Sequence, residues 1–125
     1  MLTNAFHTAT KFETRVREAE HCRLKRVDRV PVIALVQKIS DRDVLKFMVD
    51  HDVTGAGLQQ RVRSHASVKL QPSESLYAFV VIYKNDKITS ETLLPPASTF
   101  REVDSKYRSD DGFVYIVYTK EDTFG

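Results

Sequence analysis

The first part of the chain carries side chains at helical spacing. Phe12, Val16, Ala19 and Arg23 follow one another at intervals of four, three and four residues, which predicts one face of an amphipathic helix. Thr10 stands directly before this stripe and is expected to be its N-cap. The proline at position 31 ends the helix before the next segment. The TNAF segment at 3–6 indicates a further short helix in front.

Four later segments have the β-branched and aromatic composition of strands. The first two, joined by a short polar connection, predict an antiparallel hairpin. A polar stretch at 84–92, KNDKITSET, is expected to be a long loop or an extension of the third strand. The four segments are VPVIALV (30–36), LKFMV (45–49), SLYAFVVIY (75–83) and FVYIVYT (113–119).

Two helices are predicted between these strands. Thr54 caps the first, with Leu58 and Val62 four residues apart on its apolar face and Ala66 as a further candidate. Pro95 and Pro96 break the chain before the second. Ser98 or Thr99 caps that helix, whose apolar positions are Phe100, Val103 and Tyr107.

The first and last strands are apolar on both faces. Alternate residues of 30–36 point to opposite sides, yet both sets are apolar, and 113–119 behaves alike. A sheet with one solvated face would alternate apolar and polar residues instead, so the N-terminal helix is expected to cover the second face. The element order α-ββ-α-β-α-β is that of an α+β, ubiquitin-like β-grasp. We therefore expect a four-stranded mixed sheet with two helices on one face and added N-terminal helices on the other.

Length and charge narrow the class of protein. The 125 residues suffice for one domain with its own core, and 42% hydrophobic with 29% charged residues is ordinary for a globular domain. The net charge of +2 is too weak for a dedicated nucleic-acid binder. It is unevenly spread, with a net +3 over 1–30, +2 over 31–84 and −3 over 85–125.

Cysteine usage and hydropathy point to a cytoplasmic protein. Cys22 is the only cysteine, so no internal disulfide can form. The N-terminal residues lack the apolar run of a signal peptide. The longest mostly apolar stretches have seven or eight residues, less than half of what spans a bilayer.

No catalytic or metal-binding pattern emerges from the residues. The four histidines, His7, His21, His51 and His65, are at least 14 residues apart, and no zinc-type spacing occurs. Cys22 next to His21 does not make a nucleophile and base, because adjacent helical residues point in different directions. The sequence therefore predicts a protein without catalytic residues, metal or cofactor.

Five blocks of the sequence are informative together: FETRVREAEHCRLKRVDRVPVI, LKFMV, SLYAFV, LLPPASTFREVD and FVYIVYTKEDTFG. The most specific pieces are DRVPVI after a basic helix and the terminal strand ending in Phe124 and Gly125. In their order and nearly in their spacing, these blocks resemble the autophagy ubiquitin-like modifiers, the family of GABARAP and of microtubule-associated light chain three. The chain looks like a divergent member over almost its whole length.

The resemblance implies a non-enzymatic modifier joined through Gly125 to phosphatidylethanolamine on autophagosomal membranes. Glycine lets a carboxyl group enter narrow active sites, and two acyl chains supply an anchor. The implied partners are activating and conjugating enzymes, a processing and deconjugating cysteine protease, and the membrane, with a monomer before conjugation. The implied organisation is one domain over 1–125, with a helical extension (1–27), a β-grasp core (28–119) and a conjugation tail (120–125).

The resemblance also implies binding of aromatic-x-x-aliphatic peptides of autophagy receptors, added as a strand along LKFMV. Alternation along this strand gives two pockets. Arg29 and Lys46 are expected to meet acidic residues flanking the peptide. By the family pattern, the aromatic pocket comprises Glu18, Cys22, Pro31, Lys46, Met48 and Phe113, and the aliphatic pocket comprises Phe47, Val49, Val53, Leu58 and Val62.

Several residues depart from the family pattern. Cys22 replaces the usual isoleucine, Asp50 a common proline and Arg61 a leucine of the second pocket, which puts the usual peptide preference in question. The 84–92 stretch looks inserted. The competing interpretation is an unconjugated ubiquitin-like adaptor that binds cytoskeletal or other acidic partners through its basic N-terminal segment. Salt dependence distinguishes the two, because exposed charge pairs are screened and apolar pockets are not.

Overall fold

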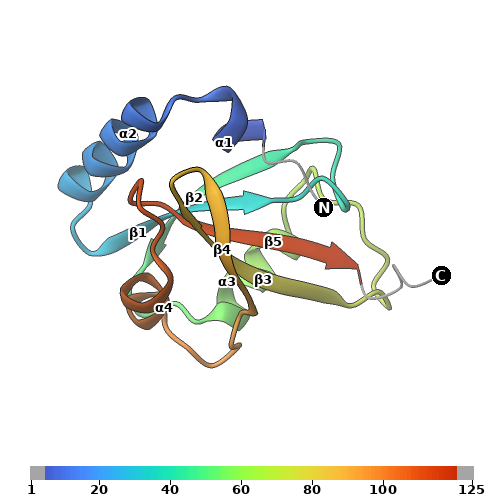
Figure 1. Cartoon of the computed structure of the whole chain (residues 1–125). Helices are drawn as coiled ribbons and strands as arrows, with labels where there is room; N and C mark the ends of the chain where they lie inside the picture. The colour runs from blue at the N-terminus through green and yellow to red at the C-terminus, as the bar shows by residue number, and fades with distance from the viewer. Residues whose placement is uncertain (1–4, 121–125) are drawn as a thin grey trace.

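The computed structural model describes residues 5–120, which form a sheet between two helical layers (Figure 1). The strand order is β2-β1-β5-β3-β4, with β1 parallel to β5 and the other neighbours antiparallel. None of the helices within 5–120 is long and apolar enough to cross a membrane. The elements are α1 (Ala5–Ala9), α2 (Phe12–Lys25), β1 (Arg29–Leu35), β2 (Val44–Asp50), α3 (Gly55–Arg63), β3 (Leu76–Lys84), β4 (Lys87–Leu93), α4 (Phe100–Tyr107) and β5 (Val114–Lys120).

Both faces of the sheet are packed, as the apolar strands predict. Along β1, Val32 and Ala34 face a core that contains Leu58 of α3 and Phe100 of α4. Ile33 and Leu35 belong to the opposite core with Phe6 and Ala19 from α1 and α2. The fold class and the placement of the helices are confirmed.

The sheet has five strands rather than the expected four. The stretch 84–92 is neither a long loop nor a simple extension of β3. It turns at Asn85 and Asp86, both with positive φ (53° and 61°), and returns as β4 along the edge of β3. Asn and Asp tolerate this backbone conformation in tight hairpin turns. β4 is exposed along almost its whole length. Because neither of its faces is buried, it can consist mostly of polar residues, and its composition therefore resembles that of a loop.

The N-terminal helix begins and packs differently from the prediction. The N-cap of α2 is Lys11, without a side-chain cap, and not Thr10. Phe12 is exposed, whereas Arg15 and Ala19 are the buried residues of α2. The face of α2 that packs on the sheet is therefore rotated from the predicted stripe. Arg15 can lie on this packed face because its charge is neutralised there by ion pairs.

Arg15 holds the N-terminal helices to the sheet. Its side chain is 2% exposed and donates to Asp111 at 3.0 Å and to Asp86 at 2.7 Å. Asp111 also accepts from the backbone N–H of Phe113 and the hydroxyl of Tyr115. Burial, together with the bond to Asp111, raises the pKa of Tyr115 and keeps this hydroxyl protonated. One buried arginine thus joins α2, the β3–β4 turn and the loop before β5.

A second ion pair connects α2 to α4. Arg23 donates to both oxygens of Asp104 at 2.7 and 2.8 Å, and Arg108 donates to the same carboxylate. Burial opposes the ionisation of Asp104, but the hydrogen bonds from these two arginines outweigh it and lower its pKa. Asp104 therefore stays charged at neutral pH and fixes the C-terminal half of α2.

The caps predicted for α3 and α4 are confirmed. Thr54 accepts from the N–H of Gly57, and Thr99 forms a reciprocal capping box with Glu102. α3 ends at Arg63, so Ala66 lies beyond it. These caps fix the starts of α3 and α4, which pack on the face of the sheet opposite α1 and α2.

Candidate functional site

A cavity of about 220 Å³ lies between α2 and the edge of the sheet formed by β1 and β2. β2 is the outermost strand on this side, so its outer edge faces no other described strand. The cavity is lined by Glu18, His21, Cys22, Pro31, Val32, Ile33, Lys46, Phe47, Met48 and Phe113. We call it the α2–β2 cavity.

All six residues expected in the aromatic pocket line the α2–β2 cavity. They come from α2, β1, β2 and the residue directly before β5. His21 also lines it and was not anticipated. It lies three residues after Glu18 on the same helix face, and this spacing was a signal that could have identified it.

Lys46 is a charged residue in the lining of the α2–β2 cavity. Its side chain is 58% exposed, and Nζ lies 3.8 Å from Glu18 and 4.5 Å from the ring centroid of Phe6. Exposed pairs of this kind contribute about 0–1 kcal/mol. The ammonium can therefore exchange Glu18 for a ligand carboxylate at small cost.

Arg29 is the first residue of β1, two residues before Pro31 of the cavity lining. Its Nε is 3.8 Å from Asp50, and both side chains are partly exposed. Nε is buried and makes no hydrogen bond. Arg29 does not line the α2–β2 cavity itself.

The residues expected in the aliphatic pocket are arranged differently. Val49, Leu58 and Val62 are fully buried in the core between the sheet and α3 and α4. Phe47 and Val53 are half-buried and pack against that core. The structure thus brings the five residues together, but only Phe47 and Val53 offer surface.

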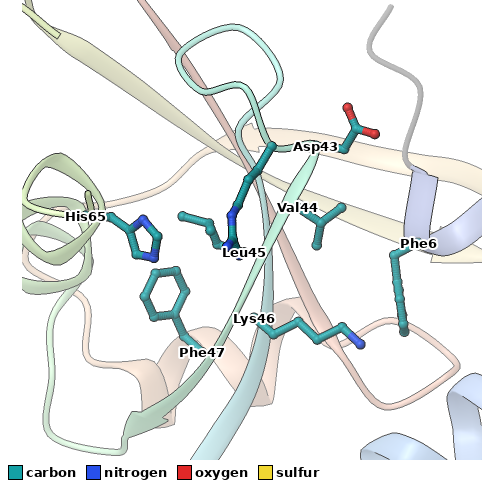
Figure 2. Close-up of a pocket in the computed structure, with 8 residues that line it drawn as sticks. Phe6, Asp43, Val44, Leu45, Lys46, Phe47 and His65 are labelled. Carbon is teal, nitrogen blue, oxygen red and sulfur yellow. The ribbon is translucent and has the colours of Figure 1, made fainter. Parts of the chain in front are cut away.

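A larger hollow of about 610 Å³ lies at the beginning of β2 (Figure 2). It shares Lys46 and Phe47 with the α2–β2 cavity, so the two hollows adjoin at β2. Its lining is formed by Phe6, Arg42, Asp43, Val44, Leu45, Lys46, Phe47 and His65. We call it the β2-start hollow.

Within residues 5–120, no group of three or more His, Cys, Asp or Glu side chains is arranged so that it could hold a metal ion. Cys22 is a free, half-buried thiol in the α2–β2 cavity. Gly125, the expected conjugation residue, lies outside the described residues.

The sheet order, the central α3 and the helices on the second face define a ubiquitin-like β-grasp protein with an N-terminal helical addition. The model of the family described as "Autophagy protein Atg8 ubiquitin like" matches residues 14–125. The chain therefore belongs to the Atg8 family of ubiquitin-like autophagy proteins, as the resemblance indicated. Members of this family are ubiquitin-like modifiers and not enzymes.

Individual relatives agree with this assignment. Autophagy-related protein 8 of Coccidioides immitis is 32% identical over 129 aligned positions, covering 99% of both chains. Its counterpart in Emericella nidulans is 31% identical, covering 99% of this chain and 98% of the relative. The crystal structure of Trypanosoma brucei ATG8 aligns with a TM-score of 0.74 at 30% identity, covering 98% and 99% of the two chains. The level of identity agrees with a divergent member.

Proposed function

We propose that this protein is conjugated through Gly125 to phosphatidylethanolamine on autophagosomal membranes, where it recruits receptors bearing an aromatic residue and a second anchor three positions later. Activating and conjugating enzymes would carry out the attachment, and a cysteine protease the processing and release. The observation that carries the recruiting function is the α2–β2 cavity, which opens beside the unpaired edge of β2.

Peptide binding at this edge follows from strand geometry. An added strand forms main-chain hydrogen bonds with β2, and alternate side chains turn toward the sheet layers on either side. The α2–β2 cavity has Pro31, Met48 and Phe113 as apolar walls, which suit an aromatic ring. Lys46 in its lining suits an acidic residue in front of that ring.

The competing function, an unconjugated adaptor with a basic N-terminal surface, has less support. Arg15 is buried against Asp111 and Asp86, and Arg23 is paired with Asp104. Two of the seven basic groups of residues 1–30 are therefore engaged inside the molecule. Lys11, Arg17, Lys25 and Arg26 remain exposed. Binding through these groups would weaken steeply as salt is raised.

Conjugation is tested by incubating the protein with activating and conjugating enzymes, ATP and liposomes containing phosphatidylethanolamine, and then measuring intact mass. The expected product is a phospholipid adduct, and fragmentation should place it at Gly125. Gly125→Ala is the matched variant and should give little or no adduct, since a Cβ hinders entry into narrow active sites. Equal lipid adducts on both chains, or none on either, would contradict the proposal.

A further inference from the structure

Arg61 stands where the family pattern has a leucine of the second pocket. It projects from α3 with an exposed side chain, and its guanidinium carbon lies 5.1 Å from the ring centroid of Phe47. This is the geometry of a cation–π contact. The guanidinium therefore covers one of the two residues that could offer apolar surface there.

The other apolar residues near Arg61 leave little for an aliphatic side chain to contact. Val49, Leu58 and Val62 are each 0% exposed, so a ligand cannot reach them without opening the core. An aliphatic group would meet Phe47 and Val53 and would also remove water from the guanidinium. Removing water from a charge without providing a partner is unfavourable.

Basic side chains lie on the Phe47 side of β2. Arg61 lies over the Phe47 ring, and Arg42 lines the β2-start hollow together with Phe47. Figure 2 shows Phe47 beside His65, whereas Lys46 points away from them toward Phe6. Asp43 is the one carboxylate in that lining, and it accepts a hydrogen bond from Gln37. Arg61 forms no ion pair with any carboxylate among residues 5–120. Its charge remains available to a ligand.

We propose that the second anchor of the ligand is acidic, so that this protein selects aromatic-x-x-Asp or aromatic-x-x-Glu peptides over aromatic-x-x-aliphatic ones. The inference rests on the proposed peptide-binding function and names the ligand chemistry of that same site. Arg61 donates two parallel N–H bonds to the carboxylate while one face of its guanidinium stays on Phe47. Arginine suits both contacts because its donors form a fixed planar fork.

Three peptides of identical sequence except at the second anchor test this specificity by titration calorimetry. They carry Glu, its neutral isostere Gln, or Leu three positions after a tryptophan. Wild type should bind the Glu peptide about fivefold more tightly than either of the others, on the scale of an accessible charge-assisted pair. The advantage over Gln should shrink as salt is raised.

Variants of Arg61 separate its role from general electrostatics. Arg61→Leu should reverse the preference, so that the Leu peptide becomes the tightest ligand. Arg61→Lys keeps the positive charge but lacks the planar set of guanidinium N–H donors. It should therefore retain only part of the preference for Glu. Lys106→Leu is the matched control, because Lys106 is also a cation over an aromatic ring, 5.5 Å from the centroid of Tyr107 on α4. It should leave all three affinities unchanged.

The outcomes separate failure of the acidic preference from failure of the proposed peptide-binding function. Tightest binding of the Leu peptide to wild type, with no effect of Arg61→Leu, would overturn the acidic preference and leave the peptide groove standing. Absence of binding by all three peptides would overturn the groove and the preference together. Equal binding of Glu and Gln peptides at every salt concentration would also refute a charge-based role of Arg61.

Discussion

His7 stacks on Tyr83, with ring centroids 3.9 Å apart and ring planes inclined by 23°. This contact joins α1 to the end of β3, next to the turn that leads into β4. The Nε2 atom of His7 also lies 3.6 Å from Asp86 at that turn. The hairpin formed by β3 and β4 therefore supports the first helix as well as extending the sheet.

The His7 contact predicts a loss of stability at acidic pH. Burial and the nearby Arg15 lower the pKa of His7 from its ordinary 6.5, although Asp86, Asp111 and Asp110 oppose the shift. The unfolded chain then binds a proton more readily than the folded one, so stability is fully present above pH 6.5 and decreases as pH falls below that value. Urea unfolding at pH 7.5 and 5.5 measures the decrease.

The variant His7→Phe tests whether His7 causes this pH dependence. Phenylalanine keeps a ring on Tyr83 but cannot be protonated, so the stability of the variant should change less between the two pH values than that of wild type. His21→Gln is the matched control, since it removes a histidine while leaving the His7–Tyr83 contact intact. The prediction is wrong if His7→Phe and wild type lose the same free energy of unfolding between pH 7.5 and 5.5.

Arg15 is predicted to be the most sensitive position of the N-terminal helices. Arg15→Met removes the partner of Asp111, which is 2% exposed. Leaving a buried carboxylate without its counter-charge should reduce the free energy of unfolding by about 3 kcal/mol. Asp86→Asn should cost less than about 1 kcal/mol, because the Asp86 side chain is 64% exposed. Urea unfolding of both variants gives the comparison.

The control for Arg15→Met is Arg17→Met, an exposed arginine of the same helix. Combining Arg15→Met with Asp111→Asn should destabilise by less than the sum of the single changes, since the two side chains share one contact. Equal losses for Arg15→Met and Arg17→Met would show that the buried pair does not hold α2.

The sequence predicted those elements whose pattern reflects burial or capping. The two apolar faces of β1 and β5 required a second helical layer, and Thr54 and Thr99 marked the starts of α3 and α4. β4 was missed because an edge strand with both faces in water shows no apolar alternation. The Asn85–Asp86 turn was the available signal for the hairpin.

The partners of Arg15 could not have been predicted from the sequence. Asp86 is 71 and Asp111 96 residues away along the chain, and an arginine on an amphipathic helix ordinarily indicates the solvated face. By sequence alone, Arg15 is one of the basic residues that give residues 1–30 their net positive charge. Only the three-dimensional arrangement shows that its charge is neutralised inside the molecule. The six residues expected in the aromatic pocket, in contrast, follow from the family resemblance alone, and all six line the α2–β2 cavity.

The α2–β2 cavity leads to a prediction about peptide binding at β2. Met48 lines this cavity and Phe47 lies between it and the β2-start hollow. Replacing both by Ala removes contacts to both anchors of an added peptide strand. Binding should weaken by about 1–2 kcal/mol or more, the scale of losing a central contact residue. Titration calorimetry with a tryptophan-containing peptide measures the change.

Phe47 also packs against the core beside α3, so loss of binding must be separated from loss of folding. Met48→Leu conserves side-chain volume and apolar character and should bind the peptide nearly as wild type does. Lys106→Leu changes an exposed residue of α4 that lines neither hollow, and it should not change binding either. If the double alanine variant unfolds at the same urea concentration as wild type and still binds with unchanged affinity, the peptide does not lie along β2.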